Sequence, residues 1–290
     1  MIKISELTKY YKKNARGVID LNFDIKEGEV FGFIGPNGAG KSTTVRSILN
    51  LIFPTSGEIK VMDLDSVKDT VEIRRNIGYL ASEVHYYNDM KVLDFLRYSA
   101  SFFKDNVDER LFYLAKKLDL DLTRKIGDLS FGNKKKVGIV QALVHEPKIY
   151  ILDEPTTGLD PLMQNIFFDL LDEERKKGAT IFFSSHILSE VQRICDRVGV
   201  IKDGELIKIE KIDDILKTSA KSVRIKTKDK IEINENFKDY RLINDEHHFT
   251  FTGEVKKLLE IISKLNIIDI NITEPSLEEI FMHYYESEEE

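Results

Sequence analysis

The sequence lacks the features of secreted and membrane-spanning proteins. Its one cysteine, Cys195, excludes a disulfide framework and fits a reducing compartment, and we expect it to be a small buried residue. The apolar runs, such as "VFGFIG" and "IYIL", are strand-sized and far shorter than the roughly 20 residues that span a bilayer. The first residues, "MIKISELTKYYKK", contain no apolar segment followed by small residues. The sequence therefore predicts a soluble chain without a signal peptide.

An excess of positive charge is also absent. The chain has 43 Lys and Arg against 50 Asp and Glu, a net charge of -7, whereas a nucleic-acid surface is usually basic. We therefore expect no nucleic-acid partner, and interpret Lys134 to Lys136 as a solvated helix face. A length of 290 residues, 42% of them hydrophobic, suffices for one large or two modest domains.

Strand and helix patterns alternate up to about residue 217. The predicted strands are "MIKISEL", "LNFDI", "EVFGFIG", "NIGYLAS", "KIYILDEP" and "TIFFSSH", followed by a hairpin around Asp203-Gly204. Helical periodicity is predicted for residues 41–50, 91–118, from "DLSFG" to about 145, and 162–177. Such alternation, with strands that are continuously apolar, is typical of an α/β fold with a buried parallel sheet.

The pattern changes near Ser219. Residues 222–233, 247–253 and 267–272 have strand patterns, and residues 254–265 and 276–285 have helix patterns. The last residues, "ESEEE", form a like-charge tail. We expect a small α+β accessory domain over residues 218–290.

A phosphate-binding motif, "GPNGAGKST", spans Gly35 to Thr43 between a predicted strand and a predicted helix. It satisfies G-x-x-x-x-G-K-[ST], in which the glycines let backbone N–H groups surround phosphate oxygens at a helix N-terminus. Lys41 then supplies a charge to the β- and γ-phosphates, and the Ser42 hydroxyl suits Mg²⁺. The motif predicts nucleotide binding.

Acidic and aromatic residues elsewhere complete a candidate site. Asp153 ends an apolar strand, where a Mg²⁺-coordinating carboxylate belongs, and the adjacent Glu154 can polarise an attacking water. His186 follows another strand, beyond the carboxyl end at which open α/β sheets bind ligands. Tyr11 could stack on a base. Each of these residues could also be merely structural.

The order "GPNGAGKST", "LSFGN", "YILDEPTTGLD", "SSH" resembles the ATP-binding-cassette (ABC) ATPases over about residues 1–217. The resemblance implies a P-loop NTPase core, with a RecA-like parallel sheet, an antiparallel β subdomain and a helical subdomain at about residues 86–145. It implies that ATP and Mg²⁺ are bound. The implied nucleotide-binding residues are Tyr11, Gly35, Pro36, Asn37, Gly38, Ala39, Gly40, Lys41, Ser42 and Thr43.

The resemblance also implies the other roles. Glu154 and His186 would be catalytic, and Asp160, with Leu159, would form the D-loop. The metal would be held by Ser42, Asp153 and Glu83. Ser130, Gly132 and Asn133 would form a signature segment that faces the γ-phosphate of a second cassette in a homodimer or heterodimer.

Two departures from the family pattern stand out. Phe131 and Asn133 replace a glycine and a glutamine of the usual signature, which the exporter branch tolerates. Where the family has its Q-loop glutamine, this chain has Ser82 followed by Glu83, and either could replace it. Tyr86, Tyr87 and Met90 form either a face for a permease helix or ordinary loop aromatics.

The segment "EPSLEEIFMHYY", Glu274 to Tyr285, resembles the end of ATPase subunits of bacterial drug and peptide exporters, including those for bacitracin. The resemblance implies a separately encoded membrane permease, ATP hydrolysis as the driving reaction, and a location on the cytoplasmic side of the membrane. The alternatives are a soluble ABC ATPase acting in translation or DNA handling, and a regulatory module without turnover. Glu154 argues against the last.

Overall fold

The computed structural model describes residues 1–12, 15–103, 106–216, 220–231 and 233–273. Contacts divide the chain into two compact units, Met1–Glu210 and Lys211–Glu290, and each has its own hydrophobic core. The boundary that the sequence predicts, 217/218, lies a few residues further along and stays a prediction.

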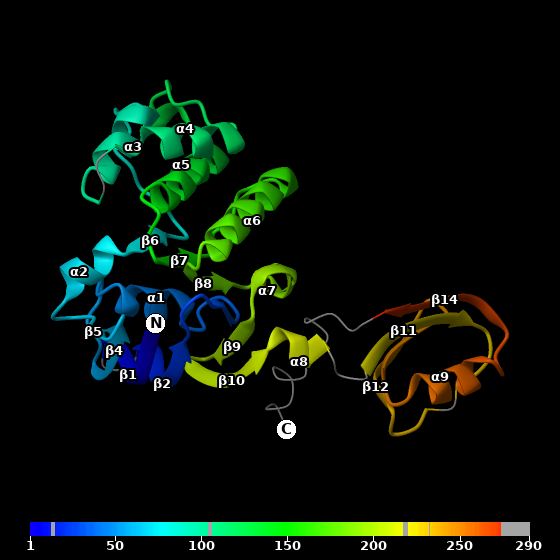
Figure 1. The fold of residues 1–290 in the computed structure, drawn as a ribbon. Helices are drawn as coiled ribbons and strands as arrows, with labels where there is room; N and C mark the ends of the chain where they lie inside the picture. Colours follow the sequence, from blue (N-terminus) through cyan, green and yellow to red (C-terminus); the bar gives the residue numbers. More distant parts are fainter. Residues whose placement is uncertain (13–14, 104–105, 217–219, 232, 274–290) are drawn as a thin grey trace. The chain divides into compact units, whose positions relative to one another are not determined.

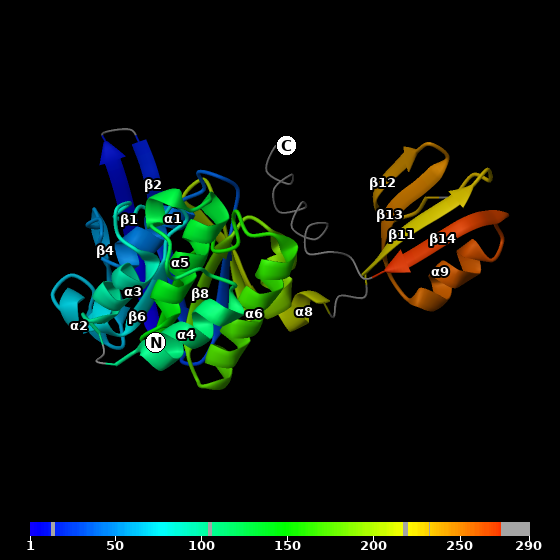
Figure 2. The ribbon, with the colours of Figure 1, turned by 90° about the horizontal axis from the view of Figure 1, so that it is seen from above.

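A six-stranded sheet forms the centre of the first unit (Figures 1 and 2). Its strand order is β10 (Glu205–Lys211), β9 (Arg197–Lys202), β3 (Val30–Ile34), β8 (Thr180–Ser185), β7 (Ile149–Asp153) and β6 (Ile77–Leu80). From β9 to β6 all neighbours are parallel. Every residue of β3, β7 and β8 is buried, which explains their continuously apolar sequences. Parallel strands end at the same edge of a sheet, so the segments that follow β3, β7 and β8 meet there.

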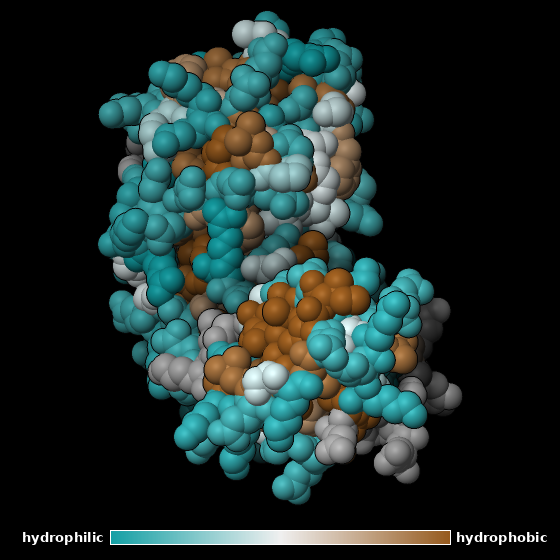
Figure 3. All heavy atoms as spheres, turned by 90° about the vertical axis from the view of Figure 1, so that its right-hand side faces the viewer, coloured by the Kyte–Doolittle hydropathy of each residue, from teal (hydrophilic) through white to brown (hydrophobic). Residues whose placement is uncertain are grey.

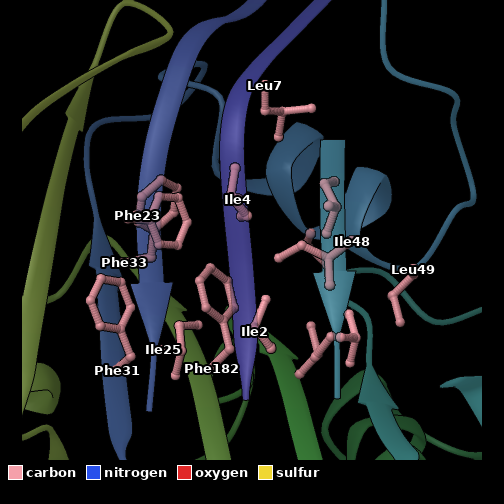
Figure 4. Close-up of a cluster of buried hydrophobic side chains, with 14 of the residues drawn as sticks. Ile2, Ile4, Leu7, Phe23, Ile25, Phe31, Phe33, Ile48, Leu49 and Phe182 are labelled. Carbon is pink, nitrogen blue, oxygen red and sulfur yellow. The ribbon is translucent and has the colours of Figure 1, made fainter. Parts of the chain in front are cut away.

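A second, antiparallel sheet packs on the first. Its order is β2 (Ala15–Ile25), β1 (Ile2–Lys12), β4 (Ser56–Val61) and β5 (Leu64–Asp65). Figure 4 shows the apolar side chains between the two sheets. The ring of Phe23 on β2 stacks on that of Phe31 on β3, with centroids 5.5 Å apart, and on that of Phe182 on β8, at 6.5 Å. This core fixes the sheet edge that carries the candidate site.

Helices follow the strands. They are α1 (Lys41–Ile48), α2 (Thr70–Arg75), α3 (Val92–Ala100), α4 (Asp108–Lys117), η1 (Ile126–Asp128), α5 (Phe131–Leu143), α6 (Pro161–Lys176), α7 (Leu188–Ile194) and α8 (Ile212–Leu216). Helix α5 packs against β6, α3 and α4, and Figures 1 and 2 show the three helices gathered as one group. The architecture confirms the predicted α/β class with antiparallel and helical parts.

The predicted helical stretch 91–118 is two helices, so its continuity was wrong. Helix α3 ends at Ala100 and α4 begins at Asp108, with Asn106 between them in the left-handed region, at φ 57°. Asparagine tolerates this backbone, which no helix can continue through. The Arg97 Nε donates to Asp108 Oδ1 at 2.9 Å, which ties the two helices together.

The C-terminal unit combines strands with a helix, while the accessory domain over residues 218–290 stays a prediction. Its sheet has the order β12 (Phe237–Ile243), β13 (Glu246–Thr252), β11 (Ala220–Thr227) and β14 (Ile267–Thr273), all antiparallel, with α9 (Val255–Ile262). Its core includes Val223, Phe251 and Leu258. The sequence analysis missed β12, because most of its side chains are exposed and its polar residues hide the alternation.

Two of the predictions concern residues beyond position 273. The predicted helix 276–285 and the acidic tail lie outside the described residues.

Hydrophobic side chains form a brown area on the face shown in Figure 3, and the exposed apolar side chains of the C-terminal unit include Leu242, Leu259 and Ile268. Cys195 is buried, as expected. Within the described parts of the chain, no helix has both the length and the apolar composition needed to cross a bilayer.

Candidate functional site

The phosphate-binding motif forms a tight loop between β3 and α1. A Cβ on Gly35 would lie 2.2 Å from the Ile201 carbonyl oxygen, so only glycine fits there. Gly40, the N-cap of α1, has φ 111°, a backbone that side-chain-bearing residues rarely adopt. The Gly204 amide of the β9–β10 turn donates to the Ala39 carbonyl at 2.9 Å. The loop is thus braced by a segment distant in sequence, with the N-terminus of α1 at its end.

Lys41 places its ammonium inside this loop. Its side chain is buried, and Nζ donates to the carbonyl oxygens of Gly35 at 2.8 Å and Pro36 at 3.2 Å. The same Nζ lies 3.4 Å from Glu154 Oε1. The cation therefore connects the loop with the end of β7.

Asp153 and Glu154 occupy different environments although they are adjacent. Asp153 ends β7, is buried, and accepts a hydrogen bond at 2.6 Å from the Ser184 hydroxyl of β8. Glu154 has φ 46°, and its N–H donates to the Ser184 carbonyl at 3.1 Å. This left-handed backbone turns the Glu154 carboxylate toward Lys41, away from the direction a continuing strand would give it.

His186 joins this cluster. Its Nδ1 lies 3.4 Å from Glu154 Oε1, so a single carboxylate oxygen faces both Lys41 and the imidazole. About 43% of the His186 side chain is exposed, so the imidazole is open to a molecule in the solvent. The structure thus brings together Lys41, Glu154 and His186 from the segments that follow three neighbouring strands, β3, β7 and β8.

Tyr11 also meets the loop. Its hydroxyl and the Thr43 Oγ1 are 3.0 Å apart, and the Lys9 ammonium lies 5.7 Å from the ring centroid. The ring is about half exposed, at 48%. An exposed aromatic face beside the phosphate loop can stack on a base.

The remaining loop residues differ in exposure. Pro36, Asn37 and Gly38 are exposed, whereas Ala39 is buried and Ser42 is half-buried at the first turn of α1. The exposed segment and the helix N-terminus together offer backbone and hydroxyl groups to a phosphate chain.

The signature segment is separate from this cluster. Ser130 is the N-cap of α5, and its hydroxyl accepts from the Asn133 N–H at 3.4 Å. A Cβ on Gly132 would lie 2.8 Å from the Gly158 carbonyl, and one on Gly158 would lie 2.2 Å from the Phe131 ring. These contacts run to the loop after β7, not to residues 35–43.

The segment predicted to be the D-loop leads into a helix. Asp160 is the N-cap of α6 and accepts from the Met163 N–H at 2.9 Å, and Leu159 is buried. Both Ser130 and Asp160 therefore stabilise helix starts, as capping chemistry dictates, and both stand beside a helix N-terminus.

The segment after β6 holds the two candidate replacements for the Q-loop glutamine. Ser82 is half-buried and its carbonyl accepts from Lys135 Nζ at 3.2 Å. Glu83 is exposed and makes no hydrogen bond or ion pair to another described residue. Within the described ranges, no group of three or more His, Cys, Asp and Glu side chains could hold a metal alone.

Three residues that position the site escaped the sequence analysis. Ser184 bonds Asp153, as above. Glu190 on α7 accepts from the hydroxyls of Thr156 at 2.6 Å and Ser185 at 2.7 Å, which joins the loops after β7 and β8. The sequence offered only an acidic residue four positions after His186 as a signal. Lys135 is fully buried, so the interpretation of Lys134 to Lys136 as a solvated face was wrong for it.

Burial lowers the pKa of Lys135 to about 8, against the opposing attraction of Asp153 and Glu154. Lys134 to Lys136 were expected to form a solvated helix face because consecutive lysines are usually exposed. The middle one faces β6 and β7 because α5 packs against β6.

A phosphate-cradling loop, a buried aspartate and an adjacent glutamate at the carboxyl edge of a parallel sheet define a P-loop nucleotide hydrolase. The profile of the ABC transporter family matches residues 18–157. The bacitracin transport ATP-binding protein BcrA of Bacillus licheniformis is 34% identical over 97% of this chain and 96% of that protein. The ABC transporter ATP-binding protein NatA of Bacillus subtilis is 37% identical over 71% and 88%.

Solved structures give the same result. An ATP-binding subunit of an ABC transporter has a TM-score of 0.70 and 31% identity, covering 74% of this chain and 91% of that one. A dimeric ATP-binding cassette in a post-hydrolysis state with ADP and Pi has a TM-score of 0.68 and 26% identity, covering 73% and 99%. The chain belongs to the ATP-binding proteins of the ABC transporter family. It is an ATPase subunit of that family, whose cassettes form dimers.

Proposed function

We propose that this chain is the motor subunit of a bacterial exporter of drugs or peptides, working with a separately encoded permease at the cytoplasmic side of the membrane. The relative named for bacitracin transport supports this over nearly the full chain, including the C-terminal unit. The carnitine transport protein of Listeria monocytogenes is 35% identical, but only 58% of its length is covered. A drug or peptide cargo therefore has better support than a carnitine-like cargo.

The cluster of Lys41, Glu154 and His186 is the observation that carries the proposed mechanism. Lys41 neutralises the β- and γ-phosphates of ATP, which draws its ammonium from the loop carbonyls toward the nucleotide. Glu154 then accepts a hydrogen bond from the attacking water and orients it toward the γ-phosphate. His186, beside the same carboxylate oxygen, contacts the γ-phosphate and holds Glu154 in place.

The donor set fits Mg²⁺, a hard cation that prefers oxygen ligands and keeps several waters. Helix α1 packs against β7, so the Ser42 hydroxyl and the buried Asp153 carboxylate belong to adjoining elements. We assign these two as ligands, with Glu83 as the third from the segment after β6. The cation would neutralise charge on the phosphate oxygens. Tyr11 would stack on the adenine.

In the proposed dimer, Ser130, Gly132 and Asn133 of one cassette face the ATP held by residues 35–43 of the other. The close approach of Gly132 and Phe131 to Gly158 supports this, because it places the signature segment beside the loop after β7 rather than beside the chain's own phosphate loop. The partner cassette is a second copy of this chain or a similar one.

The permease would meet the region where α1, α2, β6 and α3 approach one another. A surface cavity of about 220 Å³ lies there, lined by apolar side chains such as Leu51, Ile77 and Phe103 and by polar ones such as Arg74 and Gln141. Leu51 and Phe53 are 50% and 65% exposed. Tyr86 offers less of its ring to a permease, because it packs edge-on against Phe95 and its hydroxyl donates to the Lys134 carbonyl.

The proposal is tested in the bacterium that encodes the chain. A tagged chain, purified from detergent-solubilised membranes, is expected to bring a multispanning membrane protein with it. Cells that overproduce the pair are expected to survive more bacitracin than cells with the Glu154→Gln form. Copurification with ribosomes or DNA in place of a membrane protein would reject the exporter function in favour of the translation or DNA alternative.

A further inference from the structure

The ammonium of Lys135 is buried against carbonyl oxygens of two separate segments. Nζ donates to the carbonyls of Ala81 at 3.0 Å and Ser82 at 3.2 Å, which follow β6, and to that of Glu154 at 3.1 Å, which follows β7. An ammonium has three N–H donors, and three acceptors surround it. Lys135 itself lies on α5, the helix that Ser130 begins.

Under the proposed function, the segment after β6, the segment after β7 and helix α5 all contribute to hydrolysis. The Glu154 backbone is in the left-handed region, and its N–H is fixed by Ser184 on β8. Its carbonyl is fixed by Lys135. A displacement of α5 therefore acts on both Glu154 and the segment after β6, because one ammonium bonds to both.

We propose that Lys135 is a positioning residue that transmits the placement of the signature helix to Glu154 of the same chain and to the segment after β6. The inference rests on the proposed catalytic role of Glu154 and extends it. When α5 is seated against its partner's nucleotide, Lys135 holds the Glu154 backbone and the Ser82 carbonyl in one arrangement. Hydrolysis in one site then depends on a helix whose N-terminus serves the other.

The side-chain type supports this role. Burying an ammonium costs free energy that a neutral residue avoids, and the three partners of Lys135 among the described residues are neutral carbonyls. Glutamine has only two donors, and its oxygen would face carbonyl oxygens. Methionine has none. Lysine is the residue whose end group satisfies three convergent acceptors at once.

The test compares Lys135→Gln and Lys135→Met with wild type. The matched control is Lys116→Met, which removes an exposed lysine of α4 in the same group of helices. Turnover at saturating ATP is expected to fall at least about tenfold in both variants, while KM for ATP stays within about twofold. In a Glu154→Gln background, Lys135→Met is expected to keep ATP-driven dimerisation, because the phosphate loop and signature are intact. Lys116→Met is expected to match wild type.

Turnover within about twofold of wild type in Lys135→Met would overturn the inference. A parallel loss of ATP affinity and dimerisation would also overturn it, since the lysine would then act in binding. So would a loss of the native circular-dichroism spectrum in both variants, since the lysine would then be structural. Glu154→Gln, measured beside them, separates the proposed catalytic role of Glu154 from the positioning role of Lys135. If Glu154→Gln retains turnover, the catalytic role of Glu154 is rejected, whatever the Lys135 variants show.

Discussion

At the scale of single residues, one carboxylate oxygen organises the site. Glu154 Oε1 lies 3.4 Å from both Lys41 Nζ and His186 Nδ1, so each neighbour limits where the carboxylate can point. The buried Asp153, by contrast, accepts a hydrogen bond from the Ser184 hydroxyl. Two adjacent acids thereby have different partners, which suits one for a metal and the other for water.

Lys41→Ala removes the positive charge from the phosphate loop. A hydrogen bond to a charged group contributes about 1.5–3 kcal/mol, so ATP affinity is expected to fall about 10- to 100-fold. Isothermal titration calorimetry measures it, with Lys176→Ala as a control, because Lys176 is exposed on α6 and pairs only with Asp172 among described residues. Equal affinities for Lys41→Ala and wild type would show that the loop does not hold the phosphates.

Glu154→Gln keeps the shape of the side chain and removes its charge. Because a general base typically contributes about 10²–10⁴-fold, hydrolysis is expected to fall by that factor while ATP still binds. The variant is expected to be a dimer with ATP and Mg²⁺ and a monomer without nucleotide. Light scattering that finds no ATP-dependent increase in mass would contradict the shared-site arrangement.

At the scale of elements, the capping residues of α5 and α6 both stabilise a helix start and lie at its exposed N-terminus. Helices α5 and α6 begin at Ser130 and Asp160, whose side chains accept backbone N–H groups. The same caps place a serine hydroxyl and a helix N-terminus at the surface, where a second cassette's nucleotide would lie. Capping alone accounts for these two hydrogen bonds, so the role of the signature is tested in a dimer.

In the proposed dimer, Ser130→Arg and Lys41→Ala damage different halves of a composite site. A mixture of the two chains, both in the Glu154→Gln background, rebuilds one intact site in each heterodimer. The mixture is therefore expected to trap ATP and form heterodimers, whereas each variant alone stays monomeric. Crosslinking of differently tagged chains measures this.

A capping role alone gives a different result for Ser130→Arg. Loss of the cap would cost only about 1 kcal/mol of stability. The variant would then dimerise with ATP as well as its parent does, which would refute the action of the signature in trans.

At the scale of the whole molecule, the buried lysine makes stability depend on pH. Burial lowers the pKa of Lys135 to about 8, from about 10.4 in an unfolded chain. Between these values the unfolded chain binds the proton and the folded chain does not, so the free energy of unfolding rises with pH. The penalty of the buried charge is fully present below pH 8.

Wild type is therefore expected to gain up to about 3 kcal/mol relative to Lys135→Gln between pH 7.5 and pH 10.5. Other titrations occur in both proteins and cancel in the comparison. Urea unfolding followed by circular dichroism measures the difference, since the chain has no tryptophan for fluorescence. Parallel pH profiles would mean that the lysine has its ordinary pKa.

The sequence by itself determined the parts whose physics is local. The phosphate loop depends on consecutive residues, because glycine backbone freedom and a following helix N-terminus make an anion site wherever they occur together. The apolar runs of β3, β7 and β8 likewise dictated a buried parallel sheet. Its parallel order then followed from the alternation of strands and helices.

Only the tertiary structure decided which distant groups meet. The shared oxygen of Glu154, the Glu190 bonds to two loops and the burial of Lys135 depend on neighbouring strands ending at one edge and on α5 packing against β6. Side-chain patterns do not encode these positions, and "KKK" gives the same pattern whether its middle lysine is exposed or buried. The break between α3 and α4 and the exposed strand β12 were missed for a related reason: a left-handed Asn106 and strand pairing outweighed the local periodicity.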